Sequence, residues 1–333
     1  MKAALCTHYG PPEELELRDI ASPKAGKGQI VVSVKACGVN FPDVLMIQDK
    51  YQFKPALPFP PGGEVAGLVK EVGEGVEGWK AGDRVCVSTG NSGFAEEALA
   101  DARRCIHVPD NVPFDIASSF IVTYGTSWHA LKDRADLKAG ENLVVLGAAG
   151  GVGLSACEIG KAMGARVIAG ASSQEKVDLA KKHGADDGFV YPPAPLNRDQ
   201  QKQLSEDIKR LTGGAGADVL YDPVGDDYAE PALRAMNWNG RYLVIGFAAG
   251  NIPKVPLNLT LLKGCQIVGV FWGAATARDP KHAQQSLQAL MGMIADGKLK
   301  PYVSEHIPLA RAGEAIRLLM DRKAKGKVVV TME

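Results

Sequence analysis

The sequence predicts an α/β protein in which a doubly wound parallel sheet is inserted into a β-rich, barrel-like domain. Strand and helix patterns alternate from about residue 124 to 265, which implies parallel strands joined by right-handed crossovers. Residues 1 to about 120 are instead β-rich and interrupted by glycine and proline, and a β-rich tail returns near the C-terminus. We therefore expect a first domain over 1–123, completed by 271–333, and a second domain over 124–270.

The pattern of the N-terminal part predicts short strands separated by turn residues. Strands are expected at 29–36, 65–72 and 83–88, with glycine and proline clusters at 58–63 and 73–78 between them. Such spacing is typical of a small barrel-like domain.

The middle part alternates strictly between the two element types. The expected strands are 143–146, 166–170, 188–191, 217–221, 241–246 and 265–270, and the expected helices are 152–163, 174–183, 199–211 and 226–236. Gly164 and Gly184 follow two of these helices, where a C-terminal glycine is favoured.

The last part begins with a helix from Asp279-Pro280 to Gly297, which has an N-cap residue, a first-turn proline and one apolar face. We expect this helix to be structural. A strand at 302–307, a helix at 310–321 and a strand at 327–331 follow it.

Composition narrows the class of protein. Lysine plus arginine number 38, and aspartate plus glutamate also number 38, so no net charge favours nucleic acid or anionic membrane. No apolar run approaches the ~20 residues of a membrane span, and the N-terminus turns polar too early for a signal peptide. The six cysteines are scattered and form no C-x-x-C pair, which argues against a disulfide scaffold and favours a reduced, cytoplasmic protein.

A glycine-rich turn follows the strand at 143–146 and precedes the helix at 152–163. Its glycines are Gly147, Gly150, Gly151 and Gly153. A strand, a glycine turn and a helix N-terminus together cradle a dinucleotide pyrophosphate, because the backbone approaches the phosphates closely and free N–H groups face them. The alternative is an ordinary tight loop.

The end of the next strand indicates which dinucleotide is bound. NAD-binding proteins usually place an acid there, but this chain has Ser172, Ser173 and then Lys176. A carboxylate would repel a 2′-phosphate, whereas hydroxyls and a lysine can bind one. We therefore expect NADPH rather than NADH, although either serine could also be the N-cap of the next helix.

Four segments together resemble a known family along the whole chain. They are 36–43 (Ala-Cys-Gly-Val-Asn-Phe-Pro-Asp), 61–67 (Pro-Gly-Gly-Glu-Val-Ala-Gly), Gly73 with 82–85, and 148–153 (Ala-Ala-Gly-Gly-Val-Gly). The chain resembles the zinc-free medium-chain dehydrogenases/reductases of the NADPH:quinone oxidoreductase and zeta-crystallin type. This resemblance implies a Rossmann domain inserted into a GroES-like domain.

The resemblance also bears on zinc. Zinc alcohol dehydrogenases carry a cysteine ligand where this chain has Asn40 and a histidine ligand where it has Gly63. Neither residue is a good zinc ligand, and the cysteine lobe expected near 90–110 is reduced to Cys105. We expect no metal site, and we expect Cys37 to be a small core residue rather than a nucleophile.

The same resemblance implies that Asn40, Asp43, Tyr51 and Thr126 line the nicotinamide site. Asn40 and Thr126 would hydrogen-bond the nicotinamide or its ribose and so orient the ring. Tyr51 matches a tyrosine that is a proposed proton donor in related enoyl reductases, and the alternative is a wall of the substrate cleft. Asp49 stands where that loop usually has glycine.

The remaining residues carried over would contact the cofactor. Ala149, Gly150, Gly151 and Val152 match the pyrophosphate turn, and Tyr191 and Arg322 match positions near the adenosine phosphate. Contacts on the nicotinamide side are expected from Val224, Gly225, Ile245, Gly246, Phe247, Phe271 and Trp272. For Phe271 and Trp272, plain hydrophobic packing is an equal alternative.

The resulting expectation is an NADPH-dependent reductase of quinones or similar activated carbonyls. Reduction of an enone or enoyl thioester is a second reading, and a non-catalytic, crystallin-like NADPH-binding protein is a third. We also expect a homodimer formed through the apolar strand at 265–272, since an exposed edge strand calls for a partner. The alternative is an internal strand covered by the chain's own tail.

Overall fold

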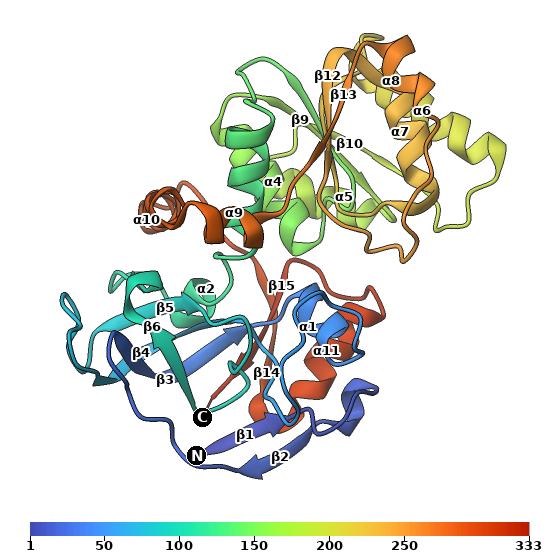
Figure 1. The fold of residues 1–333 in the computed structure, drawn as a ribbon. Helices are drawn as coiled ribbons and strands as arrows, with labels where there is room; N and C mark the ends of the chain where they lie inside the picture. Colours follow the sequence, from blue (N-terminus) through green and yellow to red (C-terminus); the bar gives the residue numbers. More distant parts are fainter. Residues whose placement is uncertain (333) are drawn as a thin grey trace. The chain divides into compact units, whose positions relative to one another are not determined.

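A computed structural model describes residues 1–332, which fall into two compact units (Figure 1). The first unit comprises Met1–Val122, Arg278–Gly297 and residues 301–332. The second comprises Thr123–Ala277 and Lys298–Lys300. One unit is thus inserted into the other, and the predicted fold class is confirmed.

The second unit contains a six-stranded sheet in which every neighbouring pair is parallel. Its strands are β8 (Asn142–Val145), β9 (Arg166–Ala171), β10 (Asp187–Val190), β11 (Ala217–Asp222), β12 (Met236–Val244) and β13 (Gln266–Gly269). The spatial order is β10-β9-β8-β11-β12-β13. From β8 the chain builds the sheet outward to β10 on one side, and it then continues from β11 to β13 on the other side. Ligands bind beyond the carboxyl ends of the strands at such a switch point.

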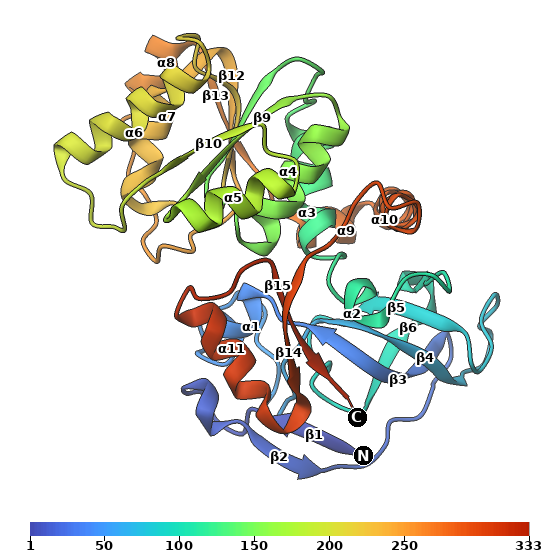
Figure 2. The same ribbon diagram turned by 180° about the vertical axis from the view of Figure 1, so that it is seen from behind.

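Helices cover both faces of this sheet (Figure 2). They are α3 (Thr123–Trp128), η3 (His129–Arg134), α4 (Gly151–Ala162), α5 (Gln174–Lys182), α6 (Arg198–Leu211), η4 (Asp226–Tyr228), α7 (Ala229–Arg234), α8 (Asn258–Lys263) and α9 (Trp272–Arg278). Val144 and Ile168 pack in one core with residues of α6 and α7. Leu143 and Val167 face the other way and lie against Gly160 of α4, because side chains alternate along a strand.

The structure corrects the second domain in two places. The helix expected at 226–236 is instead η4 followed by α7, since β12 already begins at Met236, which pairs with Ala217 of β11. The short helices α3, η3, α8 and α9 were not predicted, and α9 places Trp272 in a helix of the second unit rather than at a return to the first.

The first unit is built around a seven-stranded sheet and a smaller strand pair. The strands are β1 (Lys2–Leu5), β2 (Glu16–Asp19), β3 (Gln29–Gly38), β4 (Glu64–Val72), β5 (Arg84–Ser88), β6 (Glu97–Asp101), β7 (Ile106–His107), β14 (Val303–Pro308) and β15 (Lys327–Thr331). β3 pairs with β4 along one side, and with β6 and then β15 along the other. The C-terminal strand therefore joins the sheet beside the strand that leads to Asn40.

The helical segments of this unit are short, apart from α10. They are η1 (Pro12–Glu14), α1 (Phe41–Met46), η2 (Ala102–Arg104), α2 (Phe114–Ala117), α10 (Pro280–Ala295), η5 (Leu309–Arg311) and α11 (Ala312–Met320). α11 connects the parallel strands β14 and β15. Asp279 caps α10 by accepting from the His282 N–H, as the sequence predicted.

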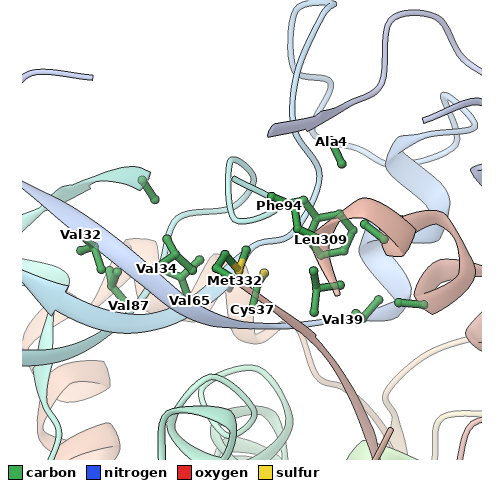
Figure 3. Packing of buried hydrophobic residues seen from close by; sticks show 14 of the residues in the cluster. Ala4, Val32, Val34, Cys37, Val39, Val65, Val87, Phe94, Leu309 and Met332 are labelled. Atoms are coloured by element: carbon green, nitrogen blue, oxygen red, sulfur yellow. The ribbon is translucent and has the colours of Figure 1, made fainter. Parts of the chain in front are cut away.

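The core of the first unit is aliphatic (Figure 3). Cys37 lies in it among Val34, Val65 and Met332 and is fully buried. Cys37 is therefore a small core residue, as expected, and burial raises the pKa of its thiol well above the usual value.

Candidate active site

The glycine turn lies at the carboxyl end of β8. Gly147 has φ +59°, a left-handed conformation that favours glycine. A Cβ on Gly153 would lie 2.3 Å from the Gly147 carbonyl oxygen, so α4 can start this close to the turn only with glycine there. The first N–H groups of α4, at Gly151 and Val152, have no intrahelical acceptor, and the positive end of the helix dipole lies beside them.

Neighbouring strands hold this turn in place. The Ala148 N–H donates to the Gly170 carbonyl at 3.0 Å, and the Gly147 N–H donates to the Tyr191 hydroxyl at 3.0 Å. Tyr191 is buried and directly supports the turn on which Ala149 and Gly150 lie. The structure thus brings Tyr191 together with the predicted pyrophosphate residues.

The end of β9 presents hydroxyls and an ammonium group. The Lys176 Nζ donates to the Ser172 Oγ at 3.1 Å, and the Lys176 N–H donates to the Ser173 Oγ at 3.3 Å. Ser173 is therefore the N-cap of α5, which is the alternative interpretation given for these serines. Ser172 and Lys176 form a pair at the strand end. The two readings of these serines are compatible.

The loops after β11 and β12 are joined by hydrogen bonds. The Ile245 N–H donates to the Asp222 carbonyl at 2.9 Å. A Cβ on Gly225, which has φ +70°, would lie 2.9 Å from the Phe247 ring. Val224, Gly225, Ile245, Gly246 and Phe247 consequently lie in two adjoining loops at the same sheet edge as the glycine turn.

Sequence reasoning missed Asp222, which organises these loops. One carboxylate oxygen accepts from the Val224 N–H at 2.8 Å and the Gly225 N–H at 2.9 Å, and the Tyr242 hydroxyl donates to the other. Burial raises the pKa of this carboxyl. An aspartate that ends a strand and is followed by Pro-Val-Gly, a turn sequence, is the signal that could have identified it.

Thr126 lies on α3, beside a buried group of hydroxyls that sequence reasoning also missed. The Tyr221 hydroxyl lies 2.8 Å from the Ser127 Oγ, which lies 2.8 Å from the Ser155 Oγ of α4. Ser155 donates to the Thr123 carbonyl at 3.1 Å, so the hydroxyls fasten α3 to α4. Half-buried Thr126 is thereby fixed relative to the glycine turn.

Phe271 and Trp272 differ in their surroundings. Trp272 is buried and packs so closely on α3 that a Cβ on Gly125 would lie 2.8 Å from its ring. Phe271 is 58 % exposed. Hydrophobic packing was the alternative to a cofactor contact for both residues. It describes the surroundings of Trp272 but not those of Phe271.

In the first unit, Asp43 caps the start of α1. Its carboxylate accepts from the Asn40 N–H at 2.8 Å and from the Gly62 N–H at 3.0 Å. Asp43 is almost fully buried, and desolvation raises its pKa from 3.8 to about 6 against the lowering by those two N–H groups. Asp43 thus connects the segment that carries Asn40 to the turn before β4.

Asn40 belongs to a buried charged network that sequence reasoning did not identify. Its Nδ2 donates to Glu64 at 2.9 Å, and its Oδ1 accepts from the Lys327 Nζ at 2.6 Å. Lys327 also contacts Glu64 at 3.3 Å and the Val39 carbonyl at 3.0 Å. Lysine and glutamate are rarely this buried unless they are paired.

Gly63, at the other position where zinc enzymes have a ligand, has no room for a side chain. A Cβ there would lie 2.9 Å from the Gly90 carbonyl oxygen, a backbone atom that cannot swing away. Among residues 1–332, no three His, Cys, Asp or Glu side chains are grouped so that they could hold a metal ion.

Tyr51 and Arg322 also belong to the first unit. Tyr51 is half-buried, and burial together with the nearby Asp43 carboxylate raises the pKa of its phenol. Asp49, in the loop before it, has φ +57°, so it adopts the left-handed conformation that the usual glycine would provide. Arg322 is exposed in the loop after α11.

Two family descriptions match this chain. Residues 26–110 match the alcohol dehydrogenase GroES-like domain, and residues 151–292 match the family described as zinc-binding dehydrogenase. No helix within residues 1–332 has the length and apolar composition needed to cross a membrane.

Individual relatives match over nearly the whole chain. A quinone oxidoreductase-like protein 2 homolog from Nematostella vectensis is 36 % identical over 99 % of this chain and 88 % of its own. A mycobacterial protein solved in complex with NADPH has a TM-score of 0.91 at 31 % identity, covering 99 % of this chain and 100 % of its own. The quinone oxidoreductase of Escherichia coli, also complexed with NADPH, has a TM-score of 0.90 at 27 % identity, covering 99 % and 100 %.

Proposed function

Because this chain belongs to the quinone oxidoreductase family of medium-chain dehydrogenases/reductases, we propose that it is an NADPH-dependent reductase that transfers a hydride to quinones or similar activated carbonyls without zinc. The observation that carries the proposal is the edge of the second unit's sheet. There a glycine turn at a helix N-terminus is followed by the Ser172–Lys176 pair, with no carboxylate ending β9.

The residues of this edge fit a dinucleotide phosphate. Gly150 has open space in front of it, since an added Cβ would meet only the Gly147 oxygen, at 3.5 Å. The N–H groups of Gly151 and Val152 would hold the pyrophosphate, and Ser172 and Lys176 would hold the 2′-phosphate. The loops with Gly225 and Phe247 would adjoin the nicotinamide half.

When bound, NADPH supplies the hydride, and the acceptor takes that hydride and one proton. Asn40 and Thr126 would orient the nicotinamide ring toward the acceptor. A quinone is already electrophilic, so it needs no Lewis acid. Asn40 and the crowded Gly63 support a reaction without zinc, because neither position offers a metal-binding side chain.

Tyr51 supports a second candidate, the reduction of enones or enoyl thioesters. Its phenol is protonated near neutral pH, as a proton donor requires, but burial and the Asp43 carboxylate raise its pKa and so make it a weaker acid. A reduced enone needs a proton on carbon, whereas a hydroquinone anion is protonated readily by solvent. Tyr51→Phe should therefore lower kcat for enones more than for quinones, and an equal drop would make Tyr51 a binding residue.

An acceptor panel tests the proposed function. Purified protein would be mixed with NADPH or NADH and with quinones, enones or enoyl-CoA esters, and the nicotinamide absorbance followed. The proposal predicts NADPH consumption with quinones. Turnover only with enones or enoyl-CoA favours the second candidate, and binding of NADPH without turnover of any acceptor favours the non-catalytic reading.

We also propose a homodimer formed along β13. This strand is the last in the sheet order, and Ile267 and Phe271 expose 38 % and 58 % of their surfaces. α8, just before it, exposes Leu261 and Leu262 as well. A second copy pairing about a two-fold axis would cover this edge. The six free cysteines support a location in the reducing cytoplasm.

A further inference from the structure

Lys327 and Glu64 form an ion pair inside the first unit, beside Asn40. The two side chains are 4 % and 0 % exposed. The three hydrogens of the Lys327 ammonium have three acceptors: the Val39 carbonyl, the Asn40 Oδ1 and the Glu64 Oε2. No donor of Lys327 is left for a substrate, so any effect of this lysine on a reaction must pass through its neighbours.

The two charges determine which way the Asn40 amide faces. An ammonium group has no acceptor, so it must face the amide oxygen, and a carboxylate has no donor, so it must face the amide nitrogen. A flipped amide would place its NH₂ against Lys327 and its oxygen against Glu64. Both contacts would then be repulsive.

In this orientation the hydrogen-bonding capacity of Asn40 is nearly used up. Its two Nδ2 hydrogens go to Glu64 at 2.9 Å and to the Gly38 carbonyl at 3.3 Å. Its main-chain N–H goes to Asp43. One lone pair of Oδ1 is bound by Lys327, which leaves the second lone pair of the side-chain oxygen.

We propose that Lys327 and Glu64 are positioning residues that make Asn40 a hydrogen-bond acceptor only. Asn40 then selects a donor on the nicotinamide half of the cofactor, a ribose hydroxyl or the carboxamide NH₂, and rejects an acceptor at the same place. This inference rests on the proposed NADPH-dependent function.

The decisive variant is the pair Lys327→Met with Glu64→Gln, which removes both charges together and leaves no unpaired buried ion. A neutral glutamine can donate to the Asn40 oxygen, so the amide is free to invert. NADPH should then bind roughly tenfold more weakly, the effect of one hydrogen bond. Binding of 2′,5′-ADP, which lacks the nicotinamide and its ribose, should stay unchanged. Both affinities are measured by calorimetric titration.

A control removes another ion pair between a basic and an acidic side chain, one that is only partly buried. Arg241 within β12 and Glu141 just before β8 form a bidentate contact at 2.7 and 2.8 Å, away from the glycine turn. Arg241→Met with Glu141→Gln should leave both affinities unchanged. In an Asn40→Ala background, the Lys327 and Glu64 changes should cause no further loss of NADPH affinity.

Equal loss of NADPH and 2′,5′-ADP affinity in the Lys327/Glu64 variant would overturn the inference, since general damage weakens both ligands. Additive losses with Asn40→Ala would overturn it too. If that variant does not fold, the unmodified protein labelled with ¹⁵N-asparagine provides the test. Solvent exchange of the Asn40 side-chain NH₂, followed by NMR, should be slow without NADPH and equally slow with it. Failure of the unmodified protein to bind NADPH would instead refute the proposed function.

Discussion

Lys176 is the residue that should distinguish NADPH from NADH, because its ammonium lies 3.1 Å from the Ser172 hydroxyl where a 2′-phosphate would sit. We predict that Lys176→Ala weakens NADPH binding and leaves NADH binding nearly unchanged. Loss of one charge-assisted hydrogen bond is worth about 1.5–3 kcal/mol, or roughly 10- to 150-fold. Titration of both cofactors measures this, and an equal loss for the two would contradict the assignment.

Asp43 should make stability depend on pH in an identifiable way. Its folded pKa of about 6 lies above the ordinary 3.8, so between about pH 4 and 6 the folded chain holds a proton that the unfolded chain has lost. The stabilising contribution of Asp43 therefore falls as pH rises through this window, by roughly 2–3 kcal/mol.

Asp43→Asn removes this titration. At pH 4 folded Asp43 already carries a proton, so its neutral acid and the amide of the variant make similar contacts with the Asn40 and Gly62 N–H groups, and the two proteins should be similarly stable. As pH rises to about 6.5, only the unmodified protein loses stability by titration of Asp43, so the variant should become the more stable of the two in urea unfolding. A difference in free energy of unfolding that does not change with pH would show that the pKa of Asp43 is not raised.

Single residues show what the sequence could and could not predict about the site. The resemblance singled out Asn40, and the structure places it in a buried polar network. Its partner Lys327 lies 287 residues away in the chain, and no local pattern reveals that pairing. Asp222 differs, since its contact with the loop after it has a local signal, and only its contact with Tyr242 of the next strand leaves no local pattern.

At the scale of elements, the contact between the glycine turn and α4 is the feature that can be tested most cleanly. Gly153→Ala would place a Cβ 2.3 Å from the Gly147 oxygen and push α4 away from the turn. We expect a loss of about 1–3 kcal/mol in stability and at least a tenfold loss in NADPH affinity.

Gly292→Ala in α10 is the control for this change. It is the same substitution in a helix, but no atom outside the neighbouring backbone of α10 lies within 4 Å of the added Cβ. It should raise stability by about 0.5–1 kcal/mol and leave NADPH binding unaffected. If the two variants behaved alike in denaturation and titration, close contact at Gly153 would not matter.

Elements with a buried apolar run or a full amphipathic face were predictable from sequence. β8 and α6 lie within one residue of their predicted bounds. The helix expected at 226–236 was too long, because tertiary pairing of Met236 with Ala217 starts a strand there. α8 has six residues, too few to show a helical period.

For the whole molecule, assembly through β13 is the property to test. Ile267→Lys places a charge on the exposed edge and should convert a dimer to a monomer. Val270 is less suitable than Ile267, since it is buried and a charge there would disturb the unit itself. Leu17→Lys, on β2 of the other unit, is a matched control that should not alter the molar mass of the particle measured by light scattering. Light scattering that finds the unmodified protein monomeric would refute the proposed dimer.

The inserted arrangement was predictable because the change from glycine-punctuated strands to strand–helix alternation is visible in the chain. The pattern could not show to which of the two units the segment 272–277 belongs. It folds as part of α9 in the second unit, where Trp272 packs against Gly125. Such a contact is tertiary and leaves no period in the sequence.

The proposed reaction is hydride transfer from NADPH without a metal. The most direct test measures zinc per chain and the rate of NADPH oxidation by a benzoquinone, before and after dialysis against a chelator. Far less than one zinc per chain and an unchanged rate are expected. Stoichiometric zinc, with a rate that the chelator abolishes and added zinc restores, would contradict it.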